Sequence, residues 1–268
     1  MGEARGKIAI LGATGRMGQA LLAALQDSTD LELCAALLSP GNELIGQDAG
    51  TDLDWRSGIA YSDDLAEALA HADVAIDVTL PTATNDIIAA CKQAECPLVI
   101  GTTGLSDEQR LALNDAANSI AVLPATNFSI AMNLMTGMVR ETCTRLGPAW
   151  QVDILETHHQ KKIDKPSGTA LALAGEIAAV RGQRLTEAVE YVEAPGDRKN
   201  PDSIAIQSVR TGAVAGEHRV TFSNGSETLE LVHRAGSRAA FASGALMAAA
   251  WLARQSPGLY TMDQVLPG

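Results

Sequence analysis

The stretch K-I-A-I-L-G-A-T-G-R-M-G, residues 7–18, decides the fold. Its first five residues are a short, mostly apolar run typical of a buried strand, and apolar residues recur at helical spacing after it, at Met17, Leu21, Leu22 and Leu25. The glycines between fit G-x-x-G-x-x-G, a pattern that allows a tight turn, close approach of a pyrophosphate and close packing of helix on sheet. The stretch therefore predicts a dinucleotide-binding turn rather than an ordinary strand-to-helix connection.

Strand and helix signals continue to alternate through the first half of the chain. Short apolar runs predict further strands, and periodic runs between them predict helices; the strands are expected at 31–37, 74–79, 98–100 and 120–123, and the helices at 63–70 and 85–93. Ser106 and Gln109 form a capping box that predicts another helix start. This alternation indicates a Rossmann-like, doubly wound parallel sheet that binds its ligand outside the carboxyl ends of the strands.

The second half has a different character. Helices are expected at 130–146 and 169–180, a loop at 194–203, and strands at 152–156, 204–209, 218–223 and 227–233, the last two joined by an Asn-Gly hairpin signal. We therefore predict an α+β domain with a mixed or antiparallel sheet. A final helix at 239–254 is apolar on all sides and is expected to pack back on the first domain, which gives a cofactor domain of residues 1–129 plus 239–268 and a substrate domain of residues 130–238.

Composition and charge narrow the class of partner. The 268-residue chain has a net charge of −12, which argues against nucleic-acid binding, and no apolar stretch is long enough for a membrane span. The N-terminus runs directly into a strand rather than into a signal peptide, so a cytoplasmic protein is expected. The four cysteines lie in or beside apolar sequence without metal-ligand spacing, which predicts buried free thiols in a reducing compartment.

Small and hydroxyl residues follow two of the predicted strands, at 101–104 (G-T-T-G) and 125–129 (A-T-N-F-S). Such residues allow a nicotinamide and its ribose to approach closely, but they also form ordinary capped turns, so both interpretations stay open. The second strand lacks the acidic residue that usually receives the adenosine ribose, because Leu38 and Ser39 stand there instead. The preference between NAD and NADP is therefore not decided, and Arg16 is the nearest candidate for a phosphate contact.

The segment E-T-H-H-Q-K-K-I-D-K-P-S-G-T, residues 156–169, carries the densest chemistry. Histidine and lysine are the cationic groups that donate a proton near neutral pH, as a reduction requires at the atom beside the one that receives hydride. They also attract carboxylates, and Ser167, Gly168 and Thr169 open a helix whose first amides bind anions. The combination predicts a pocket for a small dicarboxylate.

Purely structural interpretations of this segment, and a metal site, are the alternatives. A histidine in a strand is often structural, Lys161 and Asp164 could be simply solvated, and Pro-Ser-Gly could be only a helix start. A metal site from Glu156, His158 and His159 is also conceivable, but adjacent histidines rarely present both rings to one ion, so we expect no metal.

Taken in order, the motifs at 12–18, 101–104, 127–129 and 156–170 resemble those of the 4-hydroxy-tetrahydrodipicolinate reductase family, long called dihydrodipicolinate reductases. The resemblance spans essentially the whole chain. It implies an NAD(P)H-dependent oxidoreductase of lysine synthesis through diaminopimelate, which reduces a small cyclic dicarboxylate, (2S,4S)-4-hydroxy-2,3,4,5-tetrahydrodipicolinate, with loss of water. A non-catalytic dinucleotide sensor and a reductase of another imine or semialdehyde are the alternatives.

The resemblance also implies residue roles. His158 and Lys162 would be catalytic, as proton donor or acceptor and as proton donor, while His159, Gly168 and Thr169 would bind substrate. NADPH or NADH would contact three segments, namely Gly12, Ala13, Thr14, Gly15, Arg16 and Met17; Gly101, Thr102 and Thr103; and Ala125, Thr126, Asn127 and Phe128. Arg238 matches a further basic residue of the substrate side. Family members are similar in forming homotetramers through the sheet of the second domain, and they commonly have glutamate, often followed by arginine, where Leu38 and Ser39 stand here.

Overall fold

The computed structural model describes residues 5–194 and 197–266, so two residues of the predicted loop at 194–203 lie outside the described part. The chain forms two compact units. Unit 1 comprises Met1–Ile130 and Ala239–Gly268, and unit 2 comprises Ala131–Arg238.

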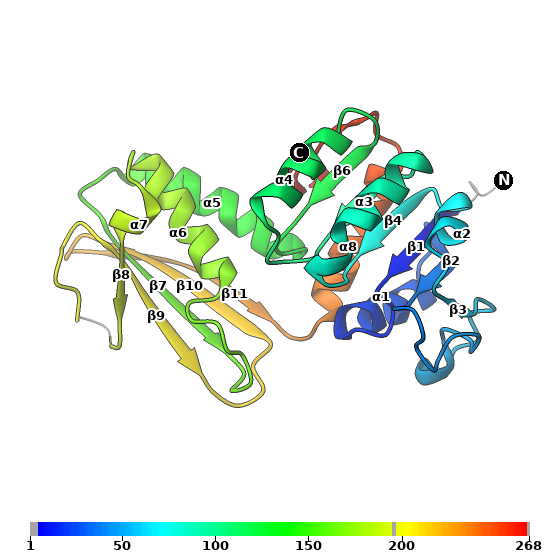
Figure 1. The fold of residues 1–268 in the computed structure, drawn as a ribbon. Helices are drawn as coiled ribbons and strands as arrows, with labels where there is room; N and C mark the ends of the chain where they lie inside the picture. The colour runs from blue at the N-terminus through cyan, green and yellow to red at the C-terminus, as the bar shows by residue number, and fades with distance from the viewer. Residues whose placement is uncertain (1–4, 195–196, 267–268) are drawn as a thin grey trace. The chain divides into compact units, whose positions relative to one another are not determined.

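Unit 1 is built on a seven-stranded parallel sheet (Figure 1). In spatial order its strands are β12 (Gly258–Leu259), β6 (Ala121–Pro124), β5 (Leu98–Ile100), β4 (Val74–Asp77), β1 (Gly6–Leu11), β2 (Leu31–Leu37) and β3 (Tyr61–Ser62). Every pairing among them is parallel, which is the geometry that strand–helix–strand crossovers produce. The order reverses at β1, so the carboxyl ends of β1 and β4 mark the switch point where such sheets bind ligands.

Helices cover both faces of this sheet. Alternate residues of β1, such as Ile8 and Ile10, pack on one face with α1 (Arg16–Gln26), α8 (Ala239–Leu252) and α9 (Met262–Val265). The intervening residues Ala9 and Leu11 pack on the other face with α2 (Leu65–Ala70), α3 (Thr84–Gln93) and α4 (Asp107–Ala116). Short 3-10 turns occur at Thr51–Leu53 and Pro81–Ala83. The final helix thus packs on the first sheet as predicted, because its alanine-rich surface fits closely between neighbours.

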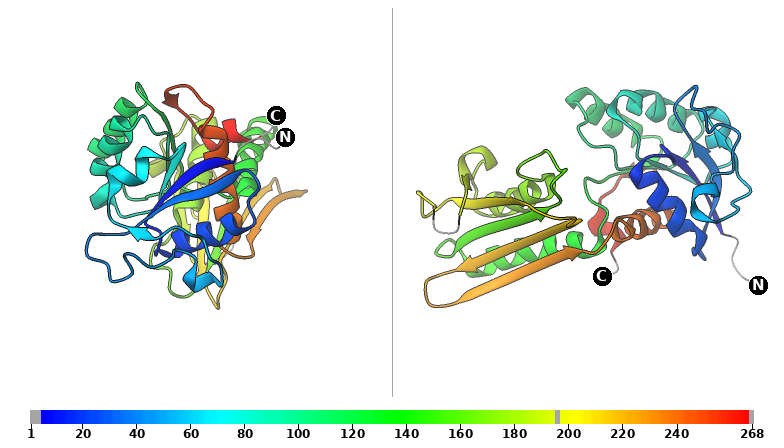
Figure 2. Two further views of the ribbon diagram at one scale, coloured as in Figure 1. Left: turned by 90° about the vertical axis from the view of Figure 1, so that its right-hand side faces the viewer. Right: turned by 90° about the horizontal axis from the view of Figure 1, so that it is seen from below.

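Unit 2 carries a mixed five-stranded sheet in the order β11 (Thr228–Ala235), β10 (Gly216–Ser223), β7 (Gln151–His158), β9 (Ile204–Arg210) and β8 (Val189–Val192). β10 pairs antiparallel with both of its neighbours, whereas β7, β9 and β8 run parallel. α5 (Ile130–Leu146) and α6 (Gly168–Val180) pack on one face, against a core that includes Ile154, Ile206 and Phe222, and α7 (Leu185–Ala188) follows α6 (Figure 2). The predicted doubly wound sheet and second mixed sheet are confirmed.

Several element boundaries differ from the prediction. β4 ends at Asp77 rather than Thr79, because the Asp77 carboxylate accepts hydrogen bonds from the backbone amide and hydroxyl of Thr79 and turns the chain. The helix expected at 63–70 begins at Leu65, because Asp64 caps it by accepting from the amide of Glu67. The capping box of Ser106 and Gln109 is present as predicted. Among the described helices, none has both the length and the apolarity to cross a bilayer.

Candidate active site

The glycine turn of unit 1 is closed by backbone contacts that leave no room for side chains. Gly12 has φ +88°, and its amide and that of Ala13 both donate to the carbonyl of Leu37 at 3.0 Å. A Cβ on Gly18 would lie 2.3 Å from the carbonyl oxygen of Gly12, so only glycine lets α1 sit this close to β1. The glycines of the sequence pattern are therefore required because side chains at these positions would collide with the backbone of the turn.

The N-terminus of α1 suits an anionic ligand. Its N-cap, Gly15, supplies no side-chain hydrogen bond, and the first turn contains no acidic residue. The first amides of a helix have no carbonyl partner within the helix, so they are available to phosphate oxygens. Arg16 begins the helix with its side chain exposed. This end of unit 1 fits the pyrophosphate of a dinucleotide.

The other two predicted cofactor segments follow neighbouring strands of the same sheet. The amide of Gly101 donates to the Asp77 carbonyl at 2.8 Å, and the amide of Ala125 donates to the Ile100 carbonyl at 2.9 Å. A Cβ on Gly101 would lie 2.5 Å from Cε2 of Phe128, so the buried Phe128 ring is stacked against the strand end itself. The structure thus brings residues 12–17, 101–103 and 125–128 to one edge of unit 1.

The buried carboxylate of Asp77 organises this edge, although Asp77 was not among the predicted site residues. Its Oδ1 accepts from Thr79, and its Oδ2 accepts from the hydroxyl of Thr102 at 3.0 Å. Burial raises the pKa of Asp77, and the hydrogen bonds from Thr79 and Thr102 oppose that shift. A buried aspartate at the end of an otherwise apolar strand was the available signal.

The end of β2 shows what replaces the usual ribose-binding acid. Leu38 is buried in the core that α1 shares, and its amide donates to the Ser62 carbonyl at 2.8 Å. Ser39 is exposed. Only Ser39 of this pair therefore presents its side chain at the surface.

In unit 2, His158 and Glu156 face the helix-covered side of β7 at its carboxyl end, in line with the core residues Val152 and Ile154. Nδ1 of His158 forms a hydrogen bond with Oε2 of Glu156. Because a carboxylate is only an acceptor, Nδ1 carries the proton and Nε2 is the atom left to exchange one. Gly216 of β10 lies beside that nitrogen, and a Cβ there would come within 3.2 Å of Nε2.

Glu156 is fully buried and ionised. Its Oε1 lies 2.8 Å from Nη2 of Arg210 and accepts from the amide of Ser167 at 3.3 Å. Burial acts to raise the pKa of Glu156, but hydrogen bonds from His158, Arg210 and Ser208 outweigh it and hold that pKa at about 2. The carboxylate therefore stays charged at neutral pH.

His218 of β10 is the second buried imidazole here, and it was not identified from the sequence. Its Nε2 lies 3.1 Å from Oγ of Ser167, and its ring meets that of His158 edge to face with centroids 5.1 Å apart. Burial, followed by the repulsion that two protonated rings would have with His158 so near, lowers the pKa of His218 to about 3, so this ring is neutral. Ser167 in turn caps α6 by accepting from the amide of Ala170.

Of the remaining predicted substrate-side residues, His159 and Lys162 lie in the loop between β7 and α6, Gly168 and Thr169 begin α6, and Arg238 directly precedes α8. Nζ of Lys162 pairs with Oδ2 of Asp164 at 2.8 Å, so Asp164 is bound to Lys162 rather than simply solvated. The amide of His159 donates to the Val214 carbonyl at 2.8 Å, and the Lys162 amide donates to the His159 carbonyl at 3.1 Å. Gly168 and Thr169 open α6, and a Cβ on Gly168 would meet nothing within 4 Å, so an anion has open access to the helix start.

The possible metal ligands in the structure are a different set from the one that the sequence suggested, with His218 in place of His159. Within the described ranges, ligand atoms of Glu156, His158 and His218 lie within 4.8 Å of one another. However, Glu156 already binds Nδ1 of His158, and Arg210 places a positive charge beside the same carboxylate, which opposes a second cation. The arrangement is that of a carboxylate-held imidazole.

A parallel sheet with a glycine turn and an open helix start at its switch point is typical of oxidoreductases that bind dinucleotides, and unit 2 adds an imidazole and an ammonium that can transfer protons. Comparison with known proteins narrows this class. Residues 6–128 match the N-terminal domain of dihydrodipicolinate reductase, and residues 131–266 match its C-terminal domain. The chain belongs to the dihydrodipicolinate reductase family.

Individual relatives and solved structures support the same family assignment. The chain is 42% identical over 262 residues to the 4-hydroxy-tetrahydrodipicolinate reductase of Alkalilimnicola ehrlichii, covering 97% of this chain and 98% of the relative, and 40% identical to that of Halorhodospira halophila over 261 residues, covering 97% and 98%. A dipicolinate-bound dihydrodipicolinate reductase from Paenisporosarcina sp. TG-14 superposes with a TM-score of 0.78 at 26% identity, covering 98% of this chain and all of that one. An amine dehydrogenase from Mycobacterium smegmatis shares the fold, with a TM-score of 0.69 at 17% identity, covering 100% of this chain and 97% of that one.

Proposed function

We propose that this chain reduces (2S,4S)-4-hydroxy-2,3,4,5-tetrahydrodipicolinate to tetrahydrodipicolinate in lysine synthesis through diaminopimelate, with NADH or NADPH as reductant and loss of water. The observation that carries the proposal is His158, held through Nδ1 by a buried, ionised Glu156 beside the start of α6. A sensor of dinucleotides has no use for a proton-transfer group oriented in this way. The four free cysteines fit action in the cytoplasm, where thiols stay reduced.

The residues divide the chemistry between the two units. The dinucleotide supplies a hydride when it is bound by residues 12–17, 101–103 and 125–128 of unit 1. In unit 2 the amides at Gly168 and Thr169, with His159, bind a substrate carboxylate at the positive end of α6. Loss of water breaks the C–OH bond and the C–H bond beside it, and Nε2 of His158 accepts the proton of that C–H. Hydride then adds to the carbon that bore the hydroxyl, and the ammonium of Lys162 donates a proton to the carbon beside it.

The proposal is tested by following oxidation of NADH and NADPH at 340 nm, with substrate generated in place from pyruvate and aspartate semialdehyde by the preceding synthase. We expect loss of absorbance that depends on the substrate. Binding of the dinucleotide without turnover would instead support a sensor or a reductase of another substrate.

Cofactor preference is expected to respond to Ser39. A glutamate at this exposed position, at the end of β2, would lie where the adenosine ribose is expected and would repel a 2′-phosphate. We predict that Ser39→Glu lowers kcat/KM for NADPH about tenfold and leaves NADH little changed, as expected for one like-charge contact near the surface. Ser39→Gln, which adds the bulk without the charge, is the matched control, and an equal loss with both cofactors would contradict the assignment.

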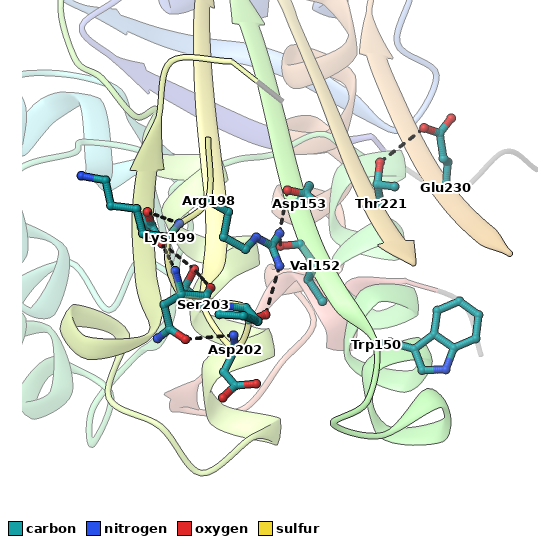
Figure 3. Close-up of polar contacts among 12 residues, drawn as sticks. Trp150, Val152, Asp153, Arg198, Lys199, Asp202, Ser203, Thr221 and Glu230 are labelled. Atoms are coloured by element: carbon teal, nitrogen blue, oxygen red, sulfur yellow. Dashed lines mark hydrogen bonds and ion pairs between the residues drawn. The ribbon is translucent and has the colours of Figure 1, made fainter. Parts of the chain in front are cut away.

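We further propose a homotetramer formed through the sheet of unit 2. No described helix of this unit packs on the face opposite α5 and α6, where half-buried or exposed apolar side chains such as Leu155 and Val232 lie among polar ones. Figure 3 shows part of that face, with Arg198 bound to the Val152 carbonyl and Asp153, and Thr221 bound to Glu230. Light scattering should give four times the chain mass of 27.9 kDa, and a mass of one chain would contradict this proposal.

A further inference from the structure

Arg210, the last residue of β9, is a junction between the two proposed proton donors. Its side chain is only 7% exposed, and all three of its nitrogens are engaged. Nη2 binds Oε1 of Glu156 at 2.8 Å and the carbonyl of Asp164, while Nε donates to the carbonyl of Lys162 at 3.3 Å. Nη1 donates to the carbonyl of Val209 at 2.8 Å, which fixes the guanidinium plane to its own strand.

Glu156 continues the same network in the other direction. One carboxylate oxygen receives Arg210 and the amide of Ser167, the N-cap of α6, and the other receives Nδ1 of His158. The carboxylate therefore links the imidazole to the helix start that is proposed to bind the substrate. It holds His158 with its proton on Nδ1 and its Nε2 directed away from the carboxylate.

We propose that the buried Glu156–Arg210 ion pair is a positioning device shared by His158 and Lys162, with Glu156 orienting the imidazole and Arg210 fixing the backbone that carries the ammonium. The inference rests on the proposed function, because it assigns no new substrate to the site. Neither residue is proposed to touch the substrate, so both are positioning residues rather than catalytic ones.

The charges of the pair also serve the site. A lone carboxylate at the start of α6 would repel an anionic substrate, and Arg210 neutralises it at 2.8 Å. A lysine could supply the charge but not the planar, forked set of donors that reaches a carboxylate and three carbonyls together. Arg210→Lys should therefore disturb the position of Lys162 while preserving the charge.

The test combines histidine NMR with kinetics on the full-length protein. The chain has five histidines, so the ring resonances of 15N-histidine-labelled protein are few, and a His158→Asn sample identifies those of His158. We expect a strongly deshielded Nδ1–H proton of His158 in the native protein and its loss or upfield movement in Glu156→Gln. The same variant should lower kcat about 100-fold, with KM changed less than about threefold, because the proton-transfer group and not substrate binding is affected.

Glu190→Gln is the matched control. Glu190 accepts hydrogen bonds from the amides of Lys199 and Asn200 and from the hydroxyl of Ser203, so it is a carboxylate of the same unit with a structural role. This variant should leave the His158 resonance and kcat unchanged. If the Glu156–Arg210 ion pair served folding alone, folded Glu156→Gln would also show an unchanged His158 resonance and an unchanged kcat, as Glu190→Gln does.

The outcomes separate this inference from the proposed function. An unchanged His158 resonance in Glu156→Gln overturns the positioning role, and so does an altered resonance with an unchanged kcat. If the native protein oxidises neither cofactor with the expected substrate, the proposed function fails, and the resonance comparison alone then supports or overturns the orientation of His158. If Glu156→Gln does not fold, Arg210→Lys decides, since the inference expects about a tenfold loss of kcat, and an unchanged kcat overturns it.

Discussion

Replacing Lys162 with alanine is expected to lower kcat about a thousandfold, within the range for loss of a positioned general acid. The ammonium is tied to Asp164 at 2.8 Å and is 24% exposed, so it is held in place yet reachable. Its backbone is fixed on both sides, because its amide donates to the His159 carbonyl and its carbonyl accepts from Arg210. Removing the side chain therefore removes the proton source without releasing the loop.

Lys161→Ala is the control for this prediction, because Lys161 is the exposed neighbour and carries the same charge. It should keep near-normal turnover. Dinucleotide affinity, measured by fluorescence titration, should be unchanged in both variants, because the glycine turn belongs to unit 1. Near-normal turnover of Lys162→Ala would remove Lys162 from the mechanism.

The features that the sequence predicted well are those fixed by short-range sterics. The glycines of the first turn are required because backbone oxygens stand where side chains would be, as at Gly18 with the Gly12 carbonyl 2.3 Å away. The capping box at Ser106 is likewise a contact over three residues. The two-residue strands β3 and β12 were missed because a run of that length has no readable periodicity.

The site residues that the sequence missed come from distant strands. Arg210 reaches Lys162 across 48 positions and His218 reaches Ser167 across 51, so no local motif could join them. A signal was nevertheless present, since Ser208 and Arg210 continue the core-facing alternation of Ile204 and Ile206 in β9. In β10, His218 precedes Val220 and Phe222 in the same alternation. Polar residues at core-facing positions of a strand indicate that this end of the strand lines a functional site rather than the hydrophobic core.

The buried His218 should make the stability of unit 2 depend on pH. Its pKa is about 3 in the folded protein, against an ordinary value of 6.5, so the folded state keeps the ring neutral while the unfolded chain takes up a proton below pH 6.5. Its contribution is therefore fully present above pH 6.5 and is lost as pH falls from there towards 3. Between pH 7 and pH 5 this linkage amounts to about 2 kcal/mol.

The groups that face His218 do not produce the same signature. His158 and Glu156 approach from β7, His233 from β11, and Lys162 from the loop after β7. The pKa of Glu156 is lowered from 4.5 to about 2, so its contribution is kept above pH 4.5 and is lost only below it, outside this window. The pKa of His233 is also lowered by burial, but this residue is common to the native protein and the variant, so its effect cancels to first order in their difference.

We therefore expect His218→Gln to lose about 2 kcal/mol less free energy of unfolding than the native protein between pH 7 and pH 5. Glutamine is neutral at both values and offers a polar end to Ser167. Urea unfolding at fixed protein concentration, in a Trp55→Phe, Trp251→Phe background, leaves Trp150 as the only tryptophan and so as the reporter of unit 2. His71→Gln, at an exposed site of unit 1, controls for the substitution itself. Equal losses in the native protein and His218→Gln would mean that the ring takes up its proton as readily when folded, and would contradict the lowered pKa of the buried His218.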